Sequence, residues 1–150
     1  MNKKSISYEF AARHVEKWVK GWTDHNLNAI MSSYAEELEF SSPNIRAFLG
    51  ENKNNTISSK RELSTYFSVG LERFPNLKFK IIDFTVSDNK VILEYSANLD
   101  GKSIVNVIEK FEFENELVKK SGAYYGVEQT TDWSDKKTSP ASQDVTIEVK

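Results

Sequence analysis

The stretch of sequence that decides the fold runs from residue 105 to residue 113 and reads VNVIEKFEF. Successive side chains of an extended strand point to opposite faces. One face of this strand is apolar except at its centre, and it carries Val105, Val107, Glu109, Phe111 and Phe113. A carboxyl on an apolar face is unfavourable unless it is paired, hydrogen-bonded or protonated, and such groups concentrate in functional cavities. Glu109 is therefore the first candidate for a catalytic residue.

The strand belongs to a series of four that short turns connect. The expected strands cover residues 77–86, 91–99, 103–113 and 117–125. Between the second and the third, Asp100-Gly101 is a strong hairpin signal, because the glycine tolerates the positive φ of a tight turn. This spacing predicts an antiparallel meander.

Three segments ahead of the meander repeat their apolar residues at helical spacing, and they cover residues 8–22, 27–34 and 59–74. Asn26 and Ser59 have suitable N-cap side chains, and Glu62 completes a capping box with Ser59. Residues 38–40 alternate like a short strand, whereas residues 45–57 have no period and are expected to form a loop. Three N-terminal helices followed by an antiparallel meander predict an α+β fold, in which the helices pack on an antiparallel sheet.

The C-terminal part of the chain changes in composition. From Val127 onward the sequence is mainly polar, so we expect a folded domain over residues 1–126 and a polar tail over residues 127–150. Within that tail, residues 145–149 have the alternation of an edge strand. A chain of 150 residues is long enough for one domain with a sizeable core.

Composition excludes several classes of function. A formal net charge of −2 argues against nucleic acid as a partner, because phosphate binding needs clustered basic residues. The absence of cysteine excludes a thiolate nucleophile and a sulfur-ligated zinc site, and two histidines are too few for a histidine-rich metal site. No apolar segment is long enough to span a membrane, and no signal peptide is apparent. We expect a cytoplasmic protein without metal or cofactor.

Five short stretches of sequence follow one another in an order that is typical of a known family. They are GWTDHNL at residues 21–27, YAEELEF at 34–40 followed by Pro43, LSTYF at 63–67, FPNLKF at 74–79 and IEKFEF at 108–113. Together they resemble the SnoaL-like proteins of the nuclear transport factor 2-like superfamily, over roughly residues 8–126. The resemblance implies a strongly bent sheet wrapped against three helices, which form a cone with an internal apolar cavity. It also implies a homodimer formed through the sheet.

The resemblance has implications for chemistry as well. Some members are cofactor-free cyclases, isomerases, dehydratases or epoxide hydrolases that move protons with a carboxylate or histidine in the cavity, and others only bind a ligand or a partner. The last strand of related sequences often carries a histidine or an acidic residue near its end. Residues 121–126 read SGAYYG and contain neither. A two-residue acid–base pair copied from those enzymes is thus not expected here.

The remaining candidates would line the cavity and orient a ligand. They are Trp18, Trp22, Tyr34, Arg46, Tyr66, Phe67, Tyr95, Phe111 and Tyr124. Ordinary core packing is the alternative for the aromatic residues, and a solvated loop residue is the alternative for the arginine. Tyr66 and Tyr95 are the preferred donors of a hydroxyl hydrogen bond. His14 lies at the rim of its helix, where we expect a partly exposed side chain or, alternatively, a proton relay.

Glu109 also has alternatives to a catalytic role. Burial would raise the pKa of its carboxyl toward neutrality, where proton transfer is most effective. Otherwise it is a structural carboxylate, paired with Arg46 or Lys110 or hydrogen-bonded to a tyrosine, or a β-bulge turns it toward water.

Two main functions follow from these observations. The first is a cofactor-independent proton-transfer enzyme of isomerase, cyclase or lyase type, acting on a small apolar or carbonyl-bearing molecule. The second is a non-catalytic module that binds a small hydrophobic ligand or a protein partner. A structural dimer whose own side chains fill the cavity is a third, and an open cavity would argue against it.

Overall fold

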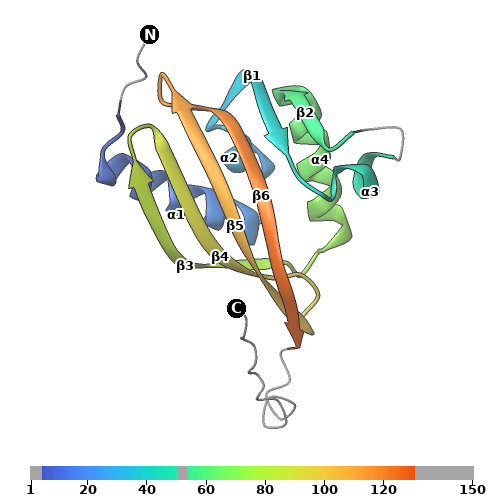
Figure 1. Ribbon diagram of the computed structural model, residues 1–150. Coiled ribbons are helices and arrows are strands. Elements are labelled where there is room, and N and C mark those ends of the chain that lie inside the picture. Colours follow the sequence, from blue (N-terminus) through green and yellow to red (C-terminus); the bar gives the residue numbers. More distant parts are fainter. Residues whose placement is uncertain (1–4, 51–53, 131–150) are drawn as a thin grey trace, which may run out of the picture.

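The residues that the structure describes form six strands and four helices (Figure 1). The computed structural model describes residues 5–50 and 54–130, with side chains up to residue 127. The helices are α1 (Tyr8–Thr23), α2 (Leu27–Met31), α3 (Ile45–Leu49) and α4 (Lys60–Arg73). The strands are β1 (Tyr34–Ser41), β2 (Thr56–Ser59), β3 (Lys78–Ser87), β4 (Lys90–Asn98), β5 (Ser103–Glu114) and β6 (Leu117–Thr130). The order of elements is that of an α+β protein, as the sequence predicts.

The strands form one sheet in the order β2-β1-β6-β5-β4-β3. The expected meander is present, because β3, β4, β5 and β6 pair antiparallel with their neighbours along the chain. The expectation of an entirely antiparallel sheet is wrong, because β1 pairs parallel with β6. In the described part of the chain β2 and β3 are the two edges, so the sheet is open rather than closed into a barrel.

Within residues 5–50 and 54–130 there are four helices rather than the three expected. The additional helix, α3, lies in the segment 45–57 that was expected to be a loop, and β2 begins in the same segment. α3 has five residues and β2 has four, so neither is long enough to show a period in the sequence. Ile45 and Ile57 are fully buried and fix this segment to the core.

The predicted helix starts are confirmed. The side chain of Asn26 accepts a hydrogen bond from the amide of Ala29, and that of Ser59 accepts one from the amide of Glu62. Both contacts satisfy an N–H group that has no partner inside its own helix. The second helix ends earlier than predicted, because Tyr34 is the first residue of β1.

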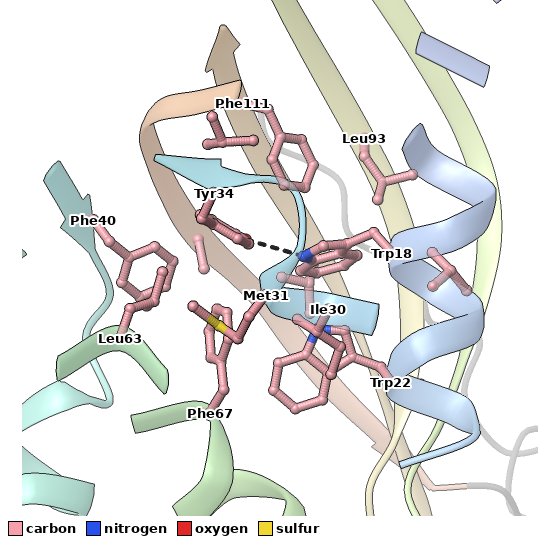
Figure 2. Close-up of a cluster of buried hydrophobic side chains, with 14 of the residues drawn as sticks. Trp18, Trp22, Ile30, Met31, Tyr34, Phe40, Leu63, Phe67, Leu93 and Phe111 are labelled. Carbon is pink, nitrogen blue, oxygen red and sulfur yellow. Dashed lines mark hydrogen bonds between the residues drawn. The ribbon is translucent and has the colours of Figure 1, made fainter. Parts of the chain in front are cut away.

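The core lies between the sheet and the helices. α1 contacts β3 and α2, whereas α4 contacts β1 and β2, and in Figure 1 these helices lie on the same side of the sheet. Figure 2 shows Trp18 and Trp22 projecting from α1 toward Tyr34 and Phe67. The Nε1 of Trp18 donates a hydrogen bond of 3.0 Å to the hydroxyl of Tyr34, which ties α1 to the start of β1 (Figure 2).

β6 departs from regular pairing with β5 near its start. Glu112 pairs with Lys120 and Phe113 pairs with Val118, so Lys119 is an extra residue in β6. Such a bulge exchanges the faces on which the following side chains lie.

The last strand is longer than predicted, since β6 continues to Thr130, past the expected end of the domain at residue 126. The segment 145–149, with its expected edge strand, lies outside the described residues. None of the described helices is long and apolar enough to cross a membrane.

Candidate functional site

A cavity of about 290 Å³ lies between the helices and the sheet. Most of its wall is aromatic, from Trp18, Trp22, Phe40, Phe48, Tyr66, Phe67, Phe74, Phe79, Tyr95 and Tyr125. The other lining residues are Asn44, Gly70, Leu77, Ala97, Leu99, Val107, Glu109 and Ala123. Glu109 is the one carboxyl among these described lining residues, which include no lysine, arginine or histidine. A mostly apolar wall with few polar groups is typical of small-molecule sites.

Glu109 is held in this wall by the regular part of the sheet. It pairs with Leu93 on β4 and with Ala123 on β6, in a stretch of β5 that contains no bulge. Its side chain is 2 % exposed, so the alternative of a bulge that turns it toward water is wrong. The hydroxyl of Tyr95 donates a hydrogen bond of 3.2 Å to its Oε1.

The environment of Glu109 favours its protonated form. Burial raises the pKa of the Glu109 carboxyl to about 8, and the hydrogen bond from Tyr95 opposes this rise. Within the described chain neither Arg46 nor Lys110 forms an ion pair with it, whereas the hydrogen bond to a tyrosine is present. A carboxyl with this pKa exists in both protonation states close to neutral pH.

Four tyrosine hydroxyls experience the charge of Glu109, and they belong to Tyr34, Tyr66, Tyr95 and Tyr125. In each case burial is the largest cause that raises the pKa of the phenol, and the nearby carboxyl raises it further. The Tyr66 hydroxyl is also 3.0 Å from the Oγ of Ser42. All four phenols therefore keep their protons at neutral pH and can donate hydrogen bonds.

His14 lies outside the cavity and is buried, contrary to the expected partial exposure. Its ring contacts the rings of Phe111 and Phe113 edge-on, with centroids 4.4 and 4.9 Å away. Burial, helped by the charge of Lys17, lowers the pKa of the His14 imidazole to about 3. Its Nε2 makes no hydrogen bond within the described chain. His14 is therefore a neutral imidazole enclosed by aromatic rings and is not among the lining residues of the cavity.

The structure brings together only part of the predicted site. Trp18, Trp22, Tyr66, Phe67 and Tyr95 line the cavity with Glu109. Tyr34 and Phe111 are buried in the core but do not line it, whereas Arg46 on α3 and Tyr124 on β6 are exposed and lie outside it.

The bulge at Lys119 explains the misplaced tyrosine. Counting in steps of two from the buried Val118 leads to Tyr124, but the extra residue moves the inward positions to Ser121, Ala123 and Tyr125. Tyr124 is consequently 61 % exposed. Tyr125 lines the cavity with part of its ring, although 42 % of the residue remains exposed.

Other lining residues were also missed by the sequence analysis. Phe79 has a usable signal, since it follows Leu77 by two residues in the expected strand 77–86 and would share its face. Asn44 and Phe48 have none, because they belong to the short segment around α3.

A second hollow adjoins the cavity near the tip of the β4–β5 hairpin. The two hollows have in common Asn44, Phe74, Ala97, Leu99 and Tyr125. The outer hollow is also lined by Asp100 and Ser103 from the hairpin. We therefore place the entrance of the cavity at this end of the sheet.

An open curved sheet packed on helices around a cavity defines a member of the nuclear transport factor 2-like fold class. The chain belongs to the SnoaL-like domain family, whose model matches residues 15–120. Among solved structures, a SnoaL-like protein of unknown function from Burkholderia thailandensis is 28% identical with a TM-score of 0.74, covering 83% of this chain and 100% of that one.

Two more distant structures share the fold alone. A nuclear transport factor 2-like protein from Anabaena variabilis is 16% identical with a TM-score of 0.67, covering 81% of this chain and 94% of its own. A protein described as a candidate ketosteroid isomerase from Kribbella flavida is 11% identical with a TM-score of 0.61, covering 79% of both chains. No curated protein matches the sequence.

Proposed function

We propose that this protein is a cofactor-independent proton-transfer enzyme of isomerase, cyclase or lyase type, with Glu109 as its catalytic acid and base. The substrate would be a small apolar or carbonyl-bearing molecule held in the aromatic cavity. The observation that carries the proposal is the Glu109 carboxyl, enclosed in that cavity with a pKa of about 8. The SnoaL-like family includes cofactor-free isomerases and cyclases, which supports the same reading.

The two oxygens of Glu109 differ in a way that suits proton transfer. Oε1 accepts the hydrogen bond from Tyr95, whereas Oε2 has no hydrogen-bond partner within the described chain. Oε2 is therefore the atom that would take a proton from a carbon next to a carbonyl and return it at another position. A base is most effective when its pKa lies near the working pH, and a pKa of about 8 meets this condition.

The tyrosines supply the second requirement, a donor for the oxygen on which negative charge develops. Tyr66 and Tyr125 line the cavity, and each carries a hydroxyl that stays protonated at neutral pH. A preorganised donor aimed at a forming enolate stabilises the transition state more than the substrate. The enclosed apolar wall strengthens every such contact by excluding water.

The alternative is a module that binds a small hydrophobic ligand or a protein without any reaction. The same cavity serves that function, and Glu109 would then contribute only to affinity. The open volume of about 290 Å³ favours both of these functions over a structural dimer with a filled interior.

We propose in addition that the protein forms a homodimer through the outer face of the sheet. The support is the exposure of Tyr124, which is 61 % accessible on that face of β6. Light scattering on the purified protein measures the oligomeric state. A monomer at all concentrations would contradict the proposed dimer without affecting the cavity.

Hydrogen–deuterium exchange tests the proton transfer before the true substrate is known. A panel of small enolisable ketones is incubated with the protein in D₂O, and NMR follows exchange next to the carbonyl. We expect catalysed exchange that Glu109→Gln reduces by about 100-fold or more, because the amide cannot accept the proton. Glu112→Gln is the matched control, since it lies three residues along β5 on the opposite face. Ligands that bind without any exchange would favour the binding module.

A further inference from the structure

The charge of the cavity has one sign only. Glu109 is its only described lining residue that ionises near neutral pH, and no cationic side chain of the described chain lines it. An anionic ligand would therefore enter an apolar space without a partner for its charge. A cationic ligand would find a carboxylate as counter-ion, because burial of a charge is tolerated when the charge is paired.

The aromatic rings provide the second feature that favours a cation. Trp18 lies 6.0 Å from Trp22 at an interplanar angle of 64°, and 5.4 Å from Tyr95 at 69°. Trp22 lies 4.9 Å from Phe67 at 73°. These three pairs are steeply inclined, whereas Phe79 lies at only 33° to Trp18 and 31° to Trp22. The rings therefore form walls of more than one orientation around the cavity that they line. Cations are attracted to the faces of such rings, most strongly out of water.

We propose that this cavity binds small organic ammonium ions, with Glu109 as the counter-ion and the rings of Trp18, Trp22 and Tyr95 around the alkyl groups. The proposal concerns the class of ligand and goes beyond the proton-transfer function, on which it does not depend. It also predicts that carboxylates and phosphates are excluded from the cavity.

Binding of such a cation is coupled to loss of a proton. The O–H bond of the Glu109 carboxyl breaks, its proton leaves for solvent, and the carboxylate remains paired with the ammonium ion. The titratable groups that face Glu109 are Tyr34 on β1, Tyr66 on α4, Tyr95 on β4 and Tyr125 on β6. All are phenols that stay protonated, and α1 contributes no titratable lining residue. Glu109 is thus the group that changes its charge.

Choline and its neutral analogue 3,3-dimethylbutan-1-ol test this inference, since they have the same shape and differ in charge. Calorimetry in two buffers of different ionisation enthalpy measures affinity and proton release together, and tryptophan fluorescence gives a second reading. At about pH 8.5 we expect choline to bind at least tenfold more tightly than the alcohol. Near pH 7 we expect release of about 0.9 proton per choline, given a carboxyl pKa of about 8.

The pH dependence and one pair of variants complete the test. With a carboxyl pKa of about 8, the affinity for choline should rise about ninefold from pH 6 to 7 and about fivefold from pH 7 to 8, and it should level off above about pH 9. Glu109→Gln should remove both the rise and the proton release, whereas Glu112→Gln should keep both. Equal binding of choline and the alcohol by the wild-type protein would overturn the inference, as would a choline affinity that does not change with pH. Turnover plays no part in these measurements, so they separate this inference from the proposed catalysis.

Discussion

The hydroxyl of Tyr95 contacts the carboxyl of Glu109 diagonally across two paired strands. Glu109 on β5 pairs with Leu93 on β4, and Tyr95 pairs with Val107, so the two side chains are offset by one inward position. Diagonal neighbours on one face of a sheet are within reach of long and aromatic side chains. The hydrogen bond of 3.2 Å therefore depends on the register of the β4–β5 hairpin rather than on a flexible loop.

Removing this donor should change the acidity of Glu109. In Tyr95→Phe the ionised carboxylate loses the hydrogen bond that favours it, so we expect the pKa of Glu109 to rise further above about 8. Carboxyl-carbon NMR titration measures this value, with Glu109→Gln to assign the signal. Tyr66→Phe is the matched control, because the Tyr66 hydroxyl pairs with Ser42 instead. A lower pKa in Tyr95→Phe would contradict this assignment of the hydrogen bond.

The stability of the protein should fall with rising pH because Glu109 keeps its proton in the folded state. Between about pH 4.5 and 8 the folded protein retains this proton while the unfolded chain has released it, so stability decreases as pH rises. The full effect is of the order of 3–5 kcal/mol. Urea unfolding at a series of pH values measures it. We expect Glu109→Gln to lack this decrease, and an unchanged slope in the variant would show that another group is responsible.

His14 should act in the opposite direction. Its folded-state pKa of about 3 lies below the ordinary value of 6.5, so the unfolded chain binds a proton that the folded protein does not. Stability should consequently rise with pH between about 3 and 6.5. We expect His14→Phe to unfold less readily in acid than the wild-type protein, which thermal scans at about pH 4 and pH 7 will test. Equal acid sensitivity in both proteins would count against a buried neutral imidazole.

The hydrogen bond between Trp18 and Tyr34 should contribute to stability. Tyr34→Phe leaves the buried Nε1 of Trp18 without its acceptor, at an expected loss of about 1–3 kcal/mol. Trp18→Phe removes the donor together with part of the core. In a double-mutant cycle we expect a coupling of about 1 kcal/mol between the two positions. Additive effects of the two substitutions would mean that the hydrogen bond contributes little.

Two helical glycines should respond differently to alanine. A Cβ at Gly70 would meet Phe48 at 3.5 Å, an ordinary contact, whereas a Cβ at Gly21 would meet Ile30 at 3.0 Å. We expect Gly70→Ala to stabilise α4 by about 0.5–1 kcal/mol and to weaken binding in the cavity that Gly70 lines. Gly21→Ala, the matched control, should destabilise the fold. Thermal unfolding and choline titration measure both effects, and unchanged binding in Gly70→Ala would place the ligand away from α4.

Most of the fold was predictable because its longer elements follow a clear period. Apolar residues recur often enough in the helices that begin at Tyr8 and Lys60, and in the four strands of the meander, to identify each element as a helix or a strand. The segment around α3 and β2 was not predictable, since elements of five and four residues are too short for a period. Nor does any local signal show that β1 pairs with β6, which is more than 70 residues away along the chain.

The candidate site was predictable to the extent that it follows strand alternation. Glu109 and Tyr95 lie on strands that keep their alternation throughout the relevant stretch, and both face the cavity. Arg46 and Tyr124 do not face the cavity, because Arg46 belongs to the short helix α3 and Tyr124 follows the bulge in β6. A bulge is decided by how two strands fit together, so the sequence of one strand does not reveal it.

The bulge at Lys119 gives β6 a tolerance for the loss of one residue. Lys119 and Lys120 together lie opposite Glu112. Loss of the codon for Lys119 would make this part of the ladder regular, because Val118 would still pair with Phe113 and Lys120 with Glu112. The pairs beyond that point would be unchanged, so Ala123 would stay beside Glu109 and Tyr125 would stay on the cavity side. A deletion at the bulge would thus straighten β6 without altering the wall of the cavity.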